Sequence, residues 1–103
     1  MREGYFYLKG HEPVWTDDMY AWSKMFDDEP GGRHVAKTDV GEVFVSTVFL
    51  GIDHNYSGGP PLLFETMVFR GHLDERQWRY STWDEAAAGH EEVVAHVKAG
   101  TEP

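Results

Sequence analysis

Two dense apolar segments, separated by a polar loop, form the centre of the chain. They cover residues 43–50 and 62–69 and are rich in Val, Phe, Leu and Thr, the residue types that suit the pleated surface of a β-sheet. In the first segment two sets of mainly apolar side chains alternate: Val43, Val45, Thr47 and Phe49 on one face, and Phe44, Ser46, Val48 and Leu50 on the other. Apolar residues on both faces predict an inner strand of a sheet.

Three shorter stretches predict further strands. Residues 4–9 alternate Tyr with Phe and Leu, residues 33–39 are more polar and suit a sheet edge, and residues 77–80 carry two aromatic side chains. Together with the two central segments they predict an antiparallel sheet of about four or five strands.

A first helix is predicted at about residues 16–26. Thr16 is a suitable N-cap, and Asp17 and Asp18 would follow it in the first turn, where the helix dipole favours negative charge. The apolar residues recur at helical spacing, and they are Met19, Trp22, Met25 and Phe26.

A second helix is predicted at about residues 83–98. Thr82 and Glu85 match the capping-box pattern T-x-x-E, and Gly100 suits the C-terminal end. One apolar stripe consists of Ala86, His90, Val93, Val94 and Val97. We expect both helices to pack on the sheet, which gives a fold of the α+β class.

Composition narrows the function classes. The 103 residues predict a single domain over residues 1–103. The formal net charge of −9 disfavours direct nucleic-acid binding, which depends on Lys and Arg, and fits either simple solubility or an acidic functional face. The sequence holds no Cys, which excludes disulfides, a thiol nucleophile and Cys-based zinc sites. No apolar run is long enough for a membrane span and no signal pattern begins the chain, so we expect a cytoplasmic protein with no membrane partner.

The loop at residues 51–61 is the main candidate for a binding site. Loops held by a rigid sheet concentrate function, and the paired glycines permit positive φ angles and exposed backbone N–H groups. The alternative is a long turn whose polar side chains satisfy its own backbone. The predicted binding residues are Asp53, His54, Asn55, Tyr56, Ser57, Gly58 and Gly59, with the aromatic residues Trp78, Tyr80 and Trp83, which either anchor an interface or belong to the core.

Asp53, His54 and Glu65 are the candidates for catalysis. Imidazole titrates near neutral pH and a carboxylate can orient it, but neighbours on an extended chain point to opposite sides. Ser57 lacks the G-x-S-x-G context of a nucleophile. Glu65 interrupts an apolar strand, where it needs a partner such as Arg70, Arg79 or a His, and a structural ion pair is the alternative interpretation.

The histidines predict no metal site. His90 and His96 stand at i and i+6 of the predicted helix and diverge around it, and no HExxH motif is present. His90, on the apolar stripe, is expected to be a core histidine with satisfied hydrogen bonds. No metal and no cofactor are therefore expected.

The segments GIDHNYSGGPPLLFETMVFRG (51–71) and RYSTWDEAAAGHEEVV (79–94) resemble a family of small uncharacterised proteins encoded by tailed phages and prophages, notably those of actinobacteria. The resemblance covers about residues 45–97. It implies no activity and no catalytic residues. What it implies is a phage-type accessory protein that works in the cytoplasm of a bacterial host cell, against a host or defence component.

Three hypotheses follow for the function. The first is a non-enzymatic binding protein, possibly a homo-oligomer, that engages a bacterial host protein or a small ligand through the 51–61 loop. The second is a small hydrolase or nucleotide-binding protein that uses Asp53, His54 and Glu65. The third is an acidic DNA mimic, which requires negative charges spaced like phosphates over one surface.

Overall fold

The computed structural model describes residues 5–28, 33–55 and 57–103. These residues form six strands and two helices, and the fold is of the α+β class, as predicted. In chain order the elements are β1 (Tyr5–Lys9), β2 (Glu12–Thr16), α1 (Met19–Asp28), β3 (His34–Val40), β4 (Val43–Phe49), β5 (Phe64–Phe69), β6 (Gln77–Tyr80) and α2 (Trp83–Ala99). Among the described residues no helix is long and apolar enough to cross a membrane.

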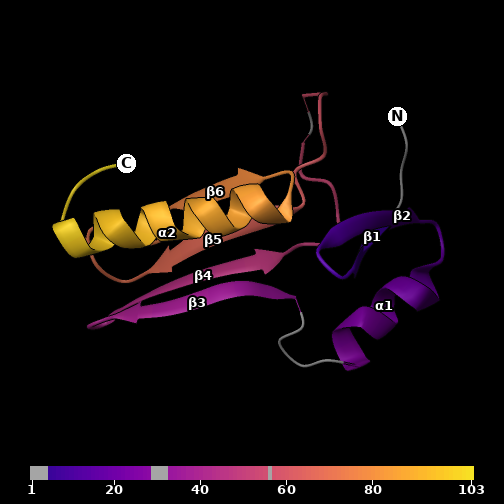
Figure 1. Ribbon diagram of the computed structural model, residues 1–103, viewed down its shortest axis with the longest axis horizontal. Helices are drawn as coiled ribbons and strands as arrows, with labels where there is room; N and C mark the ends of the chain where they lie inside the picture. The colour runs from indigo at the N-terminus through magenta and orange to yellow at the C-terminus, as the bar shows by residue number, and fades with distance from the viewer. Residues whose placement is uncertain (1–4, 29–32, 56) are drawn as a thin grey trace.

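The main sheet has four antiparallel strands in the order β3-β4-β5-β6, and α2 lies along one face of it (Figure 1). The predicted alternation in β4 is confirmed, because Val45, Thr47 and Phe49 are fully buried under α2 while the intervening residues are partly exposed. In β5 the buried residues are Phe64, Thr66 and Val68. Because the side-chain period of a strand is two, these residues place the remaining side chains on the opposite face of the sheet.

The N-terminal strand does not join this sheet. β1 pairs with β2 in a separate two-stranded antiparallel sheet, and β2 is absent from the sequence-based prediction. Pro13 lies within β2, opposite Leu8, and proline is tolerated in a strand only where its missing N–H does not interrupt a ladder, as on an edge strand. An isolated hairpin is marginally stable, and Phe6 and Leu8 dock it onto the main core.

The first helix begins later than predicted and packs elsewhere. α1 starts at Met19, and the preceding residue, Asp18, accepts a hydrogen bond from the Tyr20 N–H (3.0 Å). Thr16 instead accepts a hydrogen bond from the Asp18 N–H in the turn before the helix. Met19 is 57% exposed rather than buried. The helix contacts β1 and β2, and the side chains of Met25 and Phe26 lie outside the described part of the chain.

The second helix matches its prediction closely. Thr82 accepts a hydrogen bond from the Glu85 N–H (3.1 Å), and Gly100 ends the helix in the left-handed conformation (φ 70°). The buried side chains of α2 are those of Ala86, His90, Val93 and Val94. The apolar stripe predicted from the sequence therefore faces the sheet.

A line of polar side chains crosses the core beneath α2. His90 is fully buried, with Nδ1 2.7 Å from Thr47 Oγ1 and Nε2 2.8 Å from Thr38 Oγ1. Thr47 also bonds the hydroxyl of Thr66. Burial lowers the pKa of His90, and the nearby Glu91 opposes this effect. His90 is therefore a core histidine with satisfied hydrogen bonds, as predicted.

Candidate functional site

The 51–61 loop is shaped by its own polar side chains. Asp53 Oδ1 accepts hydrogen bonds from the backbone N–H groups of Asn55 (2.8 Å) and Leu62 (2.9 Å), which joins the start of the loop to its exit. The Asn55 side chain donates to the Pro60 carbonyl (2.8 Å) and accepts from the Ser57 N–H (3.0 Å). Asp and Asn side chains can supply hydrogen bonds to backbone groups that lie outside helices and strands. The loop therefore has a defined shape.

The paired glycines of the loop, Gly58 and Gly59, adopt conformations that favour glycine. Gly58 has φ 88° and Gly59 has φ 90°, a region that residues with a Cβ avoid. A Cβ at Gly59 would also contact the Asn55 amide nitrogen at 3.5 Å. The sequence predicts that the paired glycines permit positive φ angles, and both residues have them.

The loop forms one wall of a cleft of about 280 Å³. The opposite wall comes from the N-terminal hairpin, which supplies Phe6 and Trp15. Figure 1 shows the loop standing clear of the main sheet, beside β1 and β2. Both hydrogen bonds accepted by Asp53 use Oδ1, so Oδ2 makes no hydrogen bond to any other described residue. The cleft is lined by Phe6, Trp15, Asp53, Asn55, Gly58, Gly59 and Pro61.

A buried glycine connects the hairpin to the loop. The Phe6 N–H donates to the Gly51 carbonyl (2.8 Å), and Gly51 is itself buried with φ 81°. A Cβ at this position would lie 2.7 Å from Trp22 Nε1. The Phe6–Gly51 hydrogen bond joins the N-terminal hairpin to the beginning of the loop, and the space beside Gly51 is occupied by Trp22 of α1.

Four of the predicted binding residues line this cleft, namely Asp53, Asn55, Gly58 and Gly59. Ser57 is exposed and His54 is partly buried, and neither lines the cleft. Tyr56 lies outside the described residues. The sequence-based prediction misses Phe6 and Trp15, because nothing local to residues 6 or 15 indicates proximity to a loop more than thirty positions later.

The three predicted aromatic contact residues lie elsewhere. Trp78 packs against the cluster of Val45, Val68 and Leu73, and Tyr80 packs against that of Phe49 and Phe64. Both are on the face of the sheet that α2 covers. Burial raises the pKa of Tyr80, and Glu92 acts in the same direction. Trp78 and Tyr80 therefore pack against the core of the protein.

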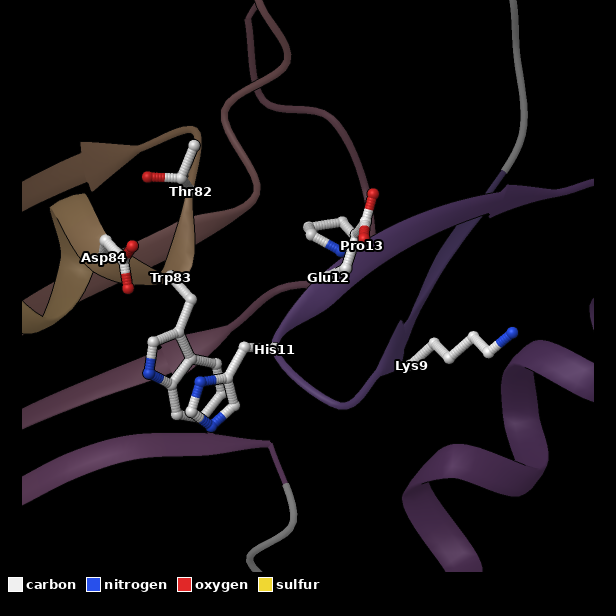
Figure 2. Close-up of a pocket in the computed structure, with 7 residues that line it drawn as sticks. All are labelled: Lys9, His11, Glu12, Pro13, Thr82, Trp83 and Asp84. Atoms are coloured by element: carbon white, nitrogen blue, oxygen red, sulfur yellow. The ribbon is translucent and has the colours of Figure 1, made fainter.

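Trp83 belongs to a second groove, between the turn of the hairpin and the start of α2. The His11 ring is stacked on the Trp83 indole, with ring centroids 3.7 Å apart and an interplanar angle of 4°. Figure 2 shows this stack, with Lys9 directed away from it. The groove has a volume of about 440 Å³, and it is lined by Lys9, His11, Glu12, Pro13, Thr82, Trp83 and Asp84. Its charged lining residues are Lys9, Glu12 and Asp84.

The candidate catalytic residues have structural partners. Asp53 holds the loop, as described above, and Glu65 accepts a hydrogen bond from Arg79 Nε at 3.0 Å. Arg79 is one of the partners that the sequence predicted for Glu65. His54 follows Asp53 in the chain, and its N–H donates to the Leu62 carbonyl (3.0 Å). The described contacts therefore assign both carboxylates to structural bonds.

No group of three or more His, Cys, Asp or Glu residues in the described ranges is arranged to hold a metal ion. Comparisons of the chain with protein-family models, with curated proteins and with solved structures find no match.

Proposed function

We propose that this protein is a non-enzymatic binding protein that accepts a cationic side chain, Lys or Arg, of a partner protein in the cleft between the 51–61 loop and the N-terminal hairpin. The observation that carries the proposal is the position of the Asp53 carboxylate in a cleft that also contains Phe6 and Trp15. A carboxylate beside aromatic rings suits a cation, because the carboxylate pairs with its charge and the ring faces attract it, by about 0.5–1 kcal/mol at exposed sites.

The charge of the chain supports the same partner. A net charge of −9 attracts basic proteins at long range and raises the rate of their association at low ionic strength. The loop is already ordered by Asp53 and Asn55, so binding loses little conformational freedom. In the context that the phage-family resemblance suggests, the partner is a bacterial host or defence protein with an exposed Lys or Arg.

The test uses a substitution that removes charge without removing the hydrogen-bond acceptor. Asp53→Asn keeps a side-chain oxygen for the N–H groups of Asn55 and Leu62, and it abolishes the negative charge of the cleft. The matched control is Asp84→Asn, which removes one negative charge from the second groove. N-acetyl-arginine amide and N-acetyl-lysine amide serve as probes, with the Trp15 indole N–H signal in NMR spectra as the readout.

We expect the Trp15 signal to shift on titration of wild type and of Asp84→Asn, and the shift to be lost in Asp53→Asn. In an affinity capture from bacterial lysate, a specific protein retained by wild type and Asp84→Asn is expected to be lost from Asp53→Asn. Equal behaviour of the two variants, or the absence of any shift in wild type, would contradict the proposal.

A further inference from the structure

The main sheet has one face covered by α2 and one face that no described helix or strand packs against. We call the second the open face. Strand alternation and the register of the sheet place eleven residues on it, in rows that run across the strands: Asp39, Phe44 and Phe69; Lys37, Ser46, Met67 and Gln77; and His34, Val48, Glu65 and Arg79.

The open face is more apolar than a solvated sheet face. In an antiparallel sheet with one face in water, the outward positions are normally polar. Here four of the eleven are large and apolar, namely Phe44, Val48, Met67 and Phe69. The rings of Phe44 and Phe69 pair across β4 and β5 with centroids 5.8 Å apart, and Phe69 is 40% exposed. Covering such a face with a second layer removes apolar surface from water and is therefore favourable.

The charges of the open face indicate which kind of partner would cover it. The face carries Lys37 and Arg79 against Asp39 and Glu65, and its formal charge is therefore zero, whereas the chain as a whole carries −9. Two acidic chains repel each other over most of their surfaces. At the open face this repulsion is least, because Glu65 and Arg79 already neutralise each other within the chain, and Lys37 and Asp39 on β3 offer both signs of charge to a second copy. A basic partner, by contrast, finds no net attraction there.

We infer that the open face is the interface of a homodimer, in which the four-stranded sheets of two copies pack face to face and α2 lies on the outside of each. Aligned sheets pack about 10 Å apart, with their inner side chains interdigitated. A two-fold arrangement brings the same patch of both copies together. The loop cleft and the N-terminal hairpin do not contribute to the open face, so this dimer presents two clefts.

The size of the face indicates a weak dimer. Four strands at about 4.8 Å spacing and six residues at about 3.3 Å rise give a flat footprint of about 400 Å². A stable complex buries about 800 Å² of accessible surface on each partner. The interdigitated side chains bury more surface than the flat footprint. The interface is nevertheless small for a specific complex. We therefore expect a dissociation constant in the micromolar range.

The first test is the mass of the full chain in solution, measured by sedimentation equilibrium from micromolar to millimolar concentration. We expect the mass to rise from 11.8 kDa to twice that value. Phe69→Lys places a charge in the open face and is expected to keep the protein monomeric, with unchanged circular dichroism. The control is Tyr20→Lys, at an aromatic residue on α1 that is 71% exposed, and it is expected to dimerise like wild type.

A second test avoids the risk that Phe69→Lys unfolds the sheet. The sequence has no cysteine, so a single Ser46→Cys substitution at the centre of the open face reports on its surroundings. Treatment with a short bismaleimide is expected to cross-link Ser46→Cys into dimers at least tenfold faster than Ser57→Cys, which carries its thiol on the exposed loop. A monomeric wild type at every concentration, or equal cross-linking of the two cysteine variants, would overturn the inference.

Discussion

His90 and Thr47 form a fully buried hydrogen bond between α2 and β4, with 2.7 Å between Nδ1 and Oγ1. The other ring nitrogen lies 2.8 Å from Thr38 Oγ1. A neutral imidazole has one donor and one acceptor nitrogen, and the two threonine hydroxyls satisfy both. The helix and the two strands beneath it are thus connected through one uncharged ring.

This arrangement predicts that acid destabilises the protein through His90. Burial lowers the pKa of the folded-state imidazole from 6.5, so on acidification the unfolded chain binds a proton first, and the free energy of unfolding falls as the pH drops below that value. Denaturant unfolding between about pH 8 and about pH 5 measures the effect. His90→Gln is expected to lose part of this pH dependence, whereas the exposed-site variant His72→Gln retains it; equal slopes in both variants would contradict the prediction.

Thr47→Val is predicted to destabilise the protein by about 1–3 kcal/mol, the cost of buried polar groups left without a partner. The change is nearly isosteric, but it removes a hydroxyl that bonds both His90 and Thr66. Thr38→Val is the comparison, because its bond to His90 is only partly buried and water can replace it. Chemical denaturation of both variants provides the measurement, and a larger loss in Thr38→Val would show that burial does not determine the cost.

Gly89→Ala is predicted to destabilise α2, although Ala is favoured over Gly inside helices by about 1 kcal/mol. A Cβ at Gly89 would overlap the ring of Tyr80. In a Tyr80→Ala background this overlap is absent, and Gly89→Ala is then expected to stabilise the helix. Thermal unfolding of the two single variants and the double variant completes the cycle. The same sign of effect in both backgrounds would refute the steric explanation.

Gly51→Ala is predicted to cost more than Gly41→Ala. Both glycines have positive φ angles, 81° and 60°, for which a residue with a Cβ loses about 1–2 kcal/mol. A Cβ at Gly41 meets nothing within 4 Å, whereas at Gly51 it would lie 2.7 Å from Trp22 Nε1. The difference between their unfolding free energies measures the cost of crowding a Cβ against Trp22 and the Phe6 carbonyl oxygen. We also expect Gly51→Ala alone to weaken binding of the arginine probe, because Gly51 positions the hairpin wall of the cleft.

Local patterns predicted the parts of the fold that depend on neighbouring residues. The alternation in β4, the capping box at Thr82 and the apolar stripe of α2 are each determined within a few residues of the chain. The predicted start of α1 was too early, because three consecutive polar residues, Thr16, Asp17 and Asp18, all suit an N-cap. The choice among them depends on where the preceding strand, β2, ends.

The parts that depend on distant residues were not predictable in the same way. β2 contains a proline and only two large apolar residues, Val14 and Trp15, so its pattern is weak, and its pairing with β1 places both strands outside the main sheet. The loop was identified as the candidate site from its own polar residues. Its cleft is completed by Phe6 and Trp15, which reach it through the bond between Phe6 and Gly51.

The order of strands in the main sheet has a kinetic consequence. Each strand from β3 to β6 pairs with its neighbour in the chain, so the sheet can grow one hairpin at a time, and such local connectivity is associated with rapid folding. The longest closure within the sheet is that of the β4–β5 connection, which contains the 51–61 loop and whose entropic cost grows only slowly with length. We expect substitutions in this loop to alter the folding rate. The β1–β2 hairpin forms a separate sheet, and we expect it to dock after the main sheet has formed, so that substitutions in it alter mainly the unfolding rate.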